Sequence, residues 1–239
     1  MRTNGRRFDT YMIGSRESGS MGELPFEEGR TAVSDCGREM LDLGLTEGTG
    51  GNISQRVDDD RVAISPTRVP YREVDPADVP VVDLEETRVQ GETPPSSELP
   101  MHTMVYRARP DAGAVVHTHS PFASVFAALG RPIEASHYLL AYVGREVPVA
   151  GYETPGSEAL GELAVEALGE DCDACLLQNH GVLVVGDDAA AALENALMVE
   201  YCARVHLFAS LLGDPVVLGE EDLDELVAGF EEYRERPDA

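Results

Sequence analysis

The amino-acid sequence predicts one three-layer domain of the α/β or α+β class. Short β-rich runs alternate with amphipathic helical patterns along the chain, and neither a linker nor an internal repeat marks a second domain. A chain of 239 residues with 43% hydrophobic residues can bury a sizeable core. We expect residues 25–239 to form this domain. Residues 1–24, which are polar, rich in glycine and without a sustained period, are expected to form a flexible extension.

The first elements can be assigned from their periodicity. The segment 25–45, PFEEGRTAVSDCGREMLDLGL, has the apolar spacing of an amphipathic helix that ends at Gly44. The runs NISQRV (52–57) and RVAIS (61–65) are separated by the acidic turn DDD, so they predict a β-hairpin. The run VPVVDL (79–84) predicts a further strand.

The later elements follow the same reasoning. Apolar positions at helical spacing predict helices over 96–110, 120–130, 157–169, 189–212 and 219–236, and β-rich runs predict strands over 112–119, 174–181 and 182–186. We expect serine side chains to cap the helices in 96–110 and 120–130, and proline opens the second of these helices.

Charge excludes several classes of partner. The chain has 44 acidic and 18 basic residues, a formal net charge of −26, and every basic residue is an arginine. Nucleic acids and anionic membranes require a basic footprint, so neither is an expected partner. No apolar run approaches the roughly 20 residues that span a bilayer, and we expect a cytoplasmic protein. Because molar salt shortens the Debye length to roughly 3 Å and screens self-repulsion, the composition indicates a halophilic protein.

Three histidines stand where strands are predicted to end. His117 and His119 lie two residues apart in AVVHTHSPFAS, and residues at this spacing on a strand point to the same face. His180 follows another apolar run and precedes Gly181, where a tight turn can bring its ring to a shared cavity. Three neutral imidazoles with one open position are typical of a catalytic zinc site.

Two further segments are suited to an anion. In TPPSSELP, Ser96 and Ser97 lie at a predicted helix start, where hydroxyls and free N–H groups form an anion pocket, and Glu98 beside them can act as acid or base. The glycine-rich turn GTGGNIS carries Thr49, Asn52 and Ser54, which together with its backbone donors are suited to wrap a phosphate.

An ordered set of motifs carries a family resemblance. Over roughly residues 28–235 the chain resembles the class II aldolase/adducin family, most closely its L-fuculose-1-phosphate aldolase branch, through GTGGNIS, ISPTRVPY, PSSE, HTH, SHYLLA and LLQNHG. The resemblance implies an α+β three-layer sandwich with a central, mostly antiparallel sheet flanked by helices. It also implies a homotetramer with active sites between subunits.

The resemblance implies an aldehyde-lyase with one zinc ion per subunit. Such an enzyme cleaves a ketose 1-phosphate, such as L-fuculose 1-phosphate, into dihydroxyacetone phosphate and an aldehyde, such as L-lactaldehyde, through a metal-stabilised enediolate. By the same resemblance, His117, His119 and His180 would bind zinc and Glu98 would move protons. The phosphate would be held by Thr49, Asn52, Thr67, Ser96 and Ser97. Tyr138 would reach in from a neighbouring subunit, and Tyr233 would belong to a mobile carboxy-terminal tail that closes over the site.

One residue departs from the family pattern. Where the aldolases usually have a glycine after Pro-Thr, this chain has Arg68. The arginine either adds a charge-assisted contact to the phosphate, crowds it and signals a different anionic substrate, or points away from the site.

Other reactions within the family use similar ligands. A ribulose-phosphate 4-epimerase would use the same retro-aldol cleavage, but that branch has an aspartate proton donor after the position of His137, where SHYLLAYVGREVP offers tyrosines. A methylthioribulose-phosphate dehydratase would have similar zinc and phosphate ligands. A non-catalytic, adducin-like interaction module lacks the metal ligands, so the three histidines and Glu98 argue against it. Independently of the family, a chain without lysine cannot stabilise the carbanion as a lysine imine, which leaves a metal as the electrophile.

Overall fold

The computed structural model describes residues 24–234, with side chains up to residue 230. The predicted extension over residues 1–24 therefore lies outside the described residues, apart from Leu24. Among the described helices, none combines the length and the apolar character needed to cross a membrane.

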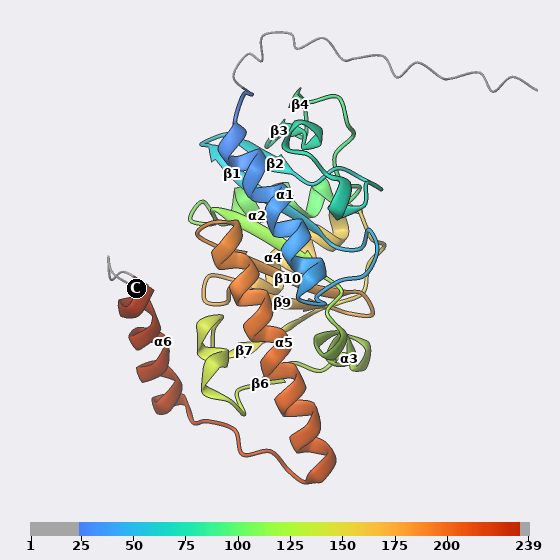
Figure 1. Cartoon of the computed structure of the whole chain (residues 1–239). Coiled ribbons are helices and arrows are strands. Elements are labelled where there is room, and N and C mark those ends of the chain that lie inside the picture. The colour runs from blue at the N-terminus through green and yellow to red at the C-terminus, as the bar shows by residue number, and fades with distance from the viewer. Residues whose placement is uncertain (1–23, 235–239) are drawn as a thin grey trace, which may run out of the picture.

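A single large sheet forms the middle of the molecule (Figure 1). Its eight strands have the order β4-β3-β2-β1-β5-β10-β9-β8. All neighbours pair antiparallel except β8 and β9, which are parallel, so the expected mostly antiparallel sheet is confirmed. The strands are β1 (Asn52–Asp58), β2 (Arg61–Ile64), β3 (Val81–Asp83), β4 (Arg88–Gln90), β5 (Ala114–Thr118), β8 (Val149–Ala150), β9 (Ala174–Leu177) and β10 (Gly181–Gly186).

Helices cover both faces of this sheet. They are α1 (Glu27–Asp42), α2 (Leu99–Ala108), α3 (Pro121–Leu129), α4 (Glu158–Leu168) and α5 (Ala189–Leu212), whereas α6 (Glu220–Arg234) packs against the segment Tyr138–Tyr142. A second, two-stranded sheet pairs β6 (Ile133–Glu134) with β7 (Glu146–Val147). Three short 3-10 helices complete the described chain: η1 (Tyr71–Glu73), η2 (Pro76–Asp78) and η3 (Tyr138–Tyr142). The predicted hairpin is present as β1 and β2, and the predicted helix over 189–212 is present as α5.

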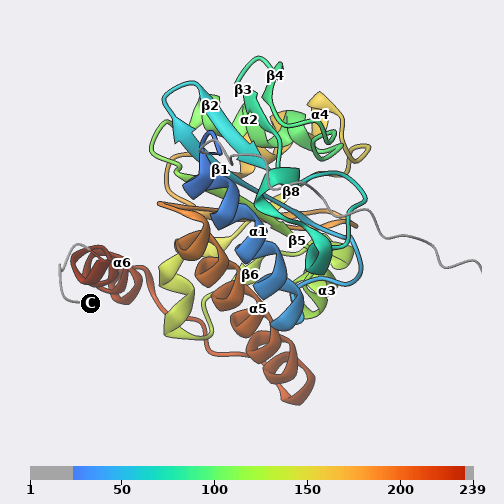
Figure 2. The ribbon, with the colours of Figure 1, turned by 45° about the horizontal axis from the view of Figure 1, so that its top comes forward.

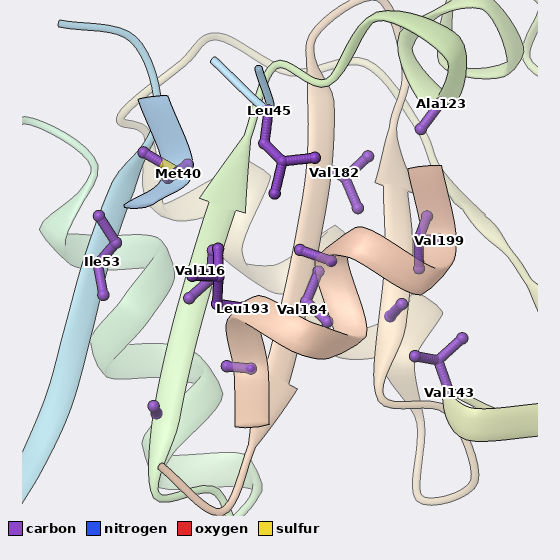
Figure 3. Close-up of a cluster of buried hydrophobic side chains, with 14 of the residues drawn as sticks. Met40, Leu45, Ile53, Val116, Ala123, Val143, Val182, Val184, Leu193 and Val199 are labelled. Carbon is purple, nitrogen blue, oxygen red and sulfur yellow. The ribbon is translucent and has the colours of Figure 1, made fainter. Parts of the chain in front are cut away.

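Side-chain alternation along the strands divides the core into two layers. On β5, Val116 belongs to the cluster covered by α1, α3 and α5, whereas Val115 belongs to the cluster covered by α2 and α4. Figure 3 shows the first cluster, where Val116 and Val184 of the strands meet Leu193 of α5. The view in Figure 2 shows α1 and α5 side by side on this face. Residues of odd number on β5, including His117, therefore face the layer of α2 and α4.

The two expected serine caps are not found. At α2 the N-cap residue is Glu98, which makes no side-chain cap hydrogen bond, and the hydroxyl of Ser96 instead accepts from the N–H of Glu98 at 3.2 Å. At α3 the N-cap is Ser120, but its buried hydroxyl accepts from Thr118 at 3.2 Å and leaves the first N–H groups of the helix uncapped by its own residue.

A carboxylate from another helix performs the capping of α3. Glu200 on α5 accepts hydrogen bonds from the N–H groups of Phe122 and Ala123, each at 2.9 Å from one of its oxygens. A carboxylate at a helix N-terminus gains both charge-assisted hydrogen bonds and a favourable interaction with the helix dipole. Tertiary packing has thus replaced the local cap that the sequence predicted.

The capping by Glu200 can be tested by substitution. We expect Glu200→Ala to lower the free energy of unfolding by about 1–2 kcal/mol, because two N–H groups at the start of α3 lose their acceptor. Denaturant unfolding followed by circular dichroism measures this difference. Glu194→Ala, at an exposed position of the same helix, should change the stability by less than about 0.5 kcal/mol. An equal loss in both variants would contradict the capping role.

Candidate active site

Strand pairing brings two of the three histidines to the middle of the sheet. Asn52 at the start of β1 is opposite His117 near the end of β5, and Leu183 of β10 is opposite His117 on its other side. His117 is fully buried, and His119, two residues further on and past the end of the strand, is exposed. The predicted same-face arrangement of these two rings is confirmed, because their centroids lie 4.9 Å apart.

The third histidine comes from the turn between β9 and β10. The prediction that a strand extends over 174–181 is wrong in its second half, because β9 ends at Leu177. Residues 178–180 form a turn in which Asn179 has a φ of 56°. This turn aims His180 at the other rings, 4.6 Å from the His117 centroid and 5.3 Å from the His119 centroid. A side chain at Gly181 is excluded, because its Cβ would lie 2.2 Å from the carbonyl oxygen of Thr118.

The imidazole nitrogens converge with one carboxylate. The Nε2 atoms of His117 and His119 are 3.1 Å apart, and the candidate ligand atoms of the three histidines all lie within 4.8 Å of one another. Glu98 closes a further side of the cluster. Its Oε2 is 3.3 Å from Nε2 of His117, and its Oε1 is 3.3 Å from Nε2 of His180.

The protonation states suit a metal. Burial, together with the neighbouring histidines, holds the pKa of His117 well below its usual value and also lowers the pKa of His119. Both rings are therefore neutral at neutral pH, which is the form that binds a metal. The Nδ1–H of His117 donates to the carbonyl oxygen of Val182 at 2.8 Å, so its Nε2 presents a lone pair to the cluster.

The spacing also fits a divalent ion. A tetrahedral zinc ion with Zn–N bonds of about 2.0–2.1 Å keeps its nitrogen ligands about 3.3–3.4 Å apart. The 3.1 Å separation of the His117 and His119 nitrogens is close to this value. His117, His119 and His180 could thus hold a metal.

Glu98 reaches the cluster from the N-terminus of α2. It is 7% exposed, and its Oε2 accepts a hydrogen bond of 2.7 Å from Nδ2 of Asn52. The amide oxygen of Asn52 accepts in turn from Nε2 of His102, which lies one helical turn after Glu98. Burial lowers the pKa of His102 to about 3, so this ring is also neutral. His102 is absent from the residues expected from the sequence, although its spacing of four from Glu98 on a predicted helix is visible there.

The predicted anion-binding segments lie next to one another and next to the histidines. The N–H of Ser65 donates to the carbonyl of Ile53 at 2.8 Å, and the N–H of Thr67 donates to the carbonyl of Pro94 at 3.0 Å. These bonds connect the segments that contain Asn52, Thr67 and Ser96. A Cβ placed on Gly50 would be 2.9 Å from Nδ1 of His119, so the glycine-rich turn adjoins the cluster.

The remaining expected residues lie at the surface or beyond the described side chains. Thr49, Ser97 and Arg68 are exposed, and Arg68 has a φ of 61° in the left-handed region where glycine is favoured. Tyr138 is 51% exposed, and in the described part of the chain its ring contacts link it to His137 and Phe230 and not to the histidine cluster. The side chain of Tyr233 is outside the described residues.

Comparison with known proteins agrees with this geometry. The profile of the family described as "Class II Aldolase and Adducin N-terminal domain" matches residues 31–207. The chain is 40% identical over 205 residues to 5-deoxy-D-ribulose 1-phosphate aldolase of Bacillus thuringiensis serovar kurstaki. This alignment covers 85% of this chain and 96% of that protein. It is 36% identical over 205 residues to 5-methylthioribulose-1-phosphate/5-deoxyribulose-1-phosphate aldolase of Rhodospirillum rubrum, covering 85% and 91% of the two chains.

A solved structure shows the same fold. An L-fuculose 1-phosphate aldolase superposes with a TM-score of 0.83 at 36% sequence identity, covering 85% of this chain and 96% of that one. The matched family includes both enzymes and adducins, but these relatives are all named as aldolases, and the histidine cluster of a metal-dependent enzyme is present. The chain belongs to the class II aldolase and adducin family, as one of its metal-dependent aldolases.

Proposed function

We propose that the protein cleaves a ketose 1-phosphate into dihydroxyacetone phosphate and a short aldehyde by a retro-aldol reaction. The observation that carries the proposal is the convergence of three imidazoles and one carboxylate beside loops rich in anion donors. An L-fuculose 1-phosphate-like sugar fits this reaction, and so does 5-deoxyribulose 1-phosphate, which the names of two relatives specify. The two substrates share the phosphorylated half and differ in the aldehyde that is released.

The reaction needs charge stabilisation and two proton movements. Cleavage removes the proton of the C4 hydroxyl, breaks the C3–C4 bond, and leaves an enediolate that takes up a proton at C3. A bound divalent ion would supply a Lewis acid that stabilises the negative charge of the enediolate by several kcal/mol. Glu98 lies at the cluster and is assigned to the proton at C3.

The C4 hydroxyl requires a group from elsewhere. We assign it to Tyr138 of the partner subunit, since the ring is 51% exposed and stacks against Phe230 on the surface of its own chain. Tyr233 is assigned, as the family resemblance implies, to a carboxy-terminal segment that covers the site.

The phosphate serves as a remote binding handle. Backbone and hydroxyl donors in the three adjoining segments would hold it and fix C2 and C3 against the cluster. We assign this role to Thr49, Asn52, Thr67, Ser96 and Ser97. We assign to Arg68 a charge-assisted contact with the phosphate, and its φ of 61°, in the region that favours glycine, is compatible with a loop that usually has a glycine here.

The alternatives within the family are separated by their products. An epimerase would rejoin the two fragments with inverted configuration at C4, and a dehydratase would release water and no dihydroxyacetone phosphate. The relative that is named for 5-methylthioribulose 1-phosphate is an aldolase, which supports carbon-carbon cleavage on that skeleton.

A substrate panel tests the reaction. Incubation with L-fuculose 1-phosphate, 5-deoxyribulose 1-phosphate, 5-methylthioribulose 1-phosphate and ribulose 5-phosphate should release dihydroxyacetone phosphate from at least one ketose 1-phosphate. A coupled glycerol-phosphate dehydrogenase assay detects this product, and NMR spectroscopy of the same mixtures detects epimers and dehydrated sugars. Epimer formation from ribulose 5-phosphate without free dihydroxyacetone phosphate would refute the proposal.

Metal removal tests the proposed zinc centre. We expect about one zinc ion per chain by elemental analysis, and loss of both zinc and cleavage after dialysis against a chelator. Re-addition of zinc should restore cleavage, and manganese, cobalt and iron(II) identify the metals that can replace it. His180→Ala should bind zinc much more weakly, whereas His137→Ala, which changes a histidine outside the cluster, should retain it. Full cleavage by the metal-free protein would overturn the assignment.

We propose that the protein is a cytoplasmic homotetramer of a halophilic organism and that its assembly depends on salt. Each chain carries −26, so an assembly of four brings like charges together and needs screening. Exposed apolar side chains support subunit contacts, because Phe208, Leu211, Leu212 and Val216 near the end of α5 are 53%, 72%, 91% and 88% exposed.

Light scattering across a salt series tests both points. In about 2 M potassium chloride we expect four times the chain mass, and below about 0.2 M we expect dissociation with loss of cleavage, since the Debye length grows beyond contact distances. An unchanged tetramer in dilute buffer would contradict the salt-adapted interpretation. A fully active monomer in high salt would remove Tyr138 of the partner subunit from the site.

A further inference from the structure

Five polar side chains form a continuous hydrogen-bonded ladder between β1 and α2. The hydroxyl of Tyr106 lies 2.9 Å from Oγ of Ser54, which lies 2.7 Å from Nδ1 of His102. Nε2 of His102 bonds to the amide oxygen of Asn52, whose Nδ2 is 2.7 Å from Oε2 of Glu98. The ladder thus ends on the carboxylate of the candidate active site.

The regular spacing of the two elements produces this ladder. Asn52 and Ser54 are two residues apart on β1, so they point to one face about 6.8 Å apart. Their partners on α2, Glu98, His102 and Tyr106, are spaced by four residues, or about 6.0 Å along the helix. Because the two repeats nearly match, each strand residue lies between two successive helix residues.

The amide of Asn52 fixes the direction of the neighbouring hydrogen bonds in this ladder. Nδ2 of Asn52 donates to Oε2 of Glu98, so the amide oxygen, which can only accept, faces Nε2 of His102. The ring of His102 must then carry its proton on Nε2, and its Nδ1 must accept from the hydroxyl of Ser54. A reversed amide would place its oxygen against the carboxylate, which is repulsive.

The ladder cannot conduct protons to solvent. Ser54 and His102 are 0% exposed and Tyr106 is 1% exposed. Beyond Tyr106 the guanidinium of Arg56 covers the ring, with its central carbon 4.8 Å from the ring centroid. A proton relay needs an exit, and these contacts close the far end. A buried chain of this kind acts by holding its terminal group in one orientation.

We propose that His102 is a positioning residue that holds the Asn52 amide with its N–H towards Oε2 of Glu98. Oε2 is thereby kept as an acceptor, and Oε1 becomes the oxygen that carries the proton to the substrate. The catalytic half of this inference rests on the proposed aldolase function. The orientation itself does not, because it follows from the hydrogen bonds alone.

Spectroscopy tests the orientation without any activity. Long-range proton–nitrogen NMR correlations of the zinc-loaded, nitrogen-15-labelled protein should show His102 as the neutral tautomer protonated at Nε2, with an unprotonated Nδ1. Comparison with His102→Gln assigns the signals. A tautomer protonated at Nδ1, or a doubly protonated ring at neutral pH, would overturn the proposal.

Kinetics test the consequence for the carboxylate. We expect His102→Leu to lower kcat for dihydroxyacetone phosphate release by about 10–100-fold with zinc retained, as for other residues that orient an active-site group. His102→Gln, whose side-chain N–H can replace the donor to Asn52, should recover kcat to within a few-fold. Wild-type kcat in His102→Leu would refute the positioning role.

A matched control separates positioning from simple destabilisation. Thr103→Val changes the next residue of α2, which is equally buried but hydrogen-bonds Glu86 and Leu99 instead of Asn52. This variant should keep kcat per folded chain even where its stability falls, and a parallel loss of kcat would contradict the proposal.

A double substitution identifies the route of the effect. In an Asn52→Ala background, His102→Leu should lower kcat by no more than about twofold further, because the effect of His102 passes through Asn52. Additive losses of kcat in the double variant would show that the effect of His102 does not pass through Asn52. If wild-type protein cleaves none of the ketose 1-phosphates, the proposed function fails, whereas the tautomer measurement still decides the orientation of the ladder.

Discussion

The antiparallel register of β1, β5 and β10 is the constraint on which the candidate site depends. It places Asn52, His117 and Leu183 in one row across the sheet, and alternation turns the first two towards the layer of α2 and α4. A slip of one residue would turn His117 towards the apolar layer of α1 and α5. The buried valines and leucines of these strands oppose such a slip, so hydrophobic packing fixes the position of the candidate metal ligand His117.

The candidate site also requires close contact between the backbone at two glycines and the end of β5. A Cβ at Gly181 would clash with the carbonyl of Thr118, and a Cβ at Gly51 would lie 2.5 Å from the carbonyl oxygen of His117. These glycines let the turn of His180 and the glycine-rich turn at 48–51 approach the strand end that carries His117. The fully buried polar side chains nearby are compatible with stability because they hydrogen-bond one another, from Tyr106 to Glu98.

The net negative charge of the chain opposes the binding of a negatively charged substrate. A chain with a net charge of −26 attracts cations and repels an anionic sugar phosphate. The candidate site would counter this locally through the cation that the imidazoles could hold and through the N–H donors of the neighbouring loops. High salt would weaken the long-range repulsion while leaving the short, partly buried contacts of the site largely intact.

Local patterns along the chain predicted the candidate metal ligands and most of the helices and strands. Periodicity predicted the hairpin of β1 and β2 and the long helix α5, and the spacing of His117 and His119 predicted two rings on one face, because these signals are local. Packing and strand register selected which distant groups meet. Glu200 replaced Ser120 as the cap of α3, the turn at Asn179 shortened the predicted strand and aimed His180, and the match of β1 with α2 brought His102 to Asn52. The contacts of Glu200 with Phe122 and of His102 with Asn52 join residues far apart in the chain, and their partners are selected by packing and register, which no local pattern encodes.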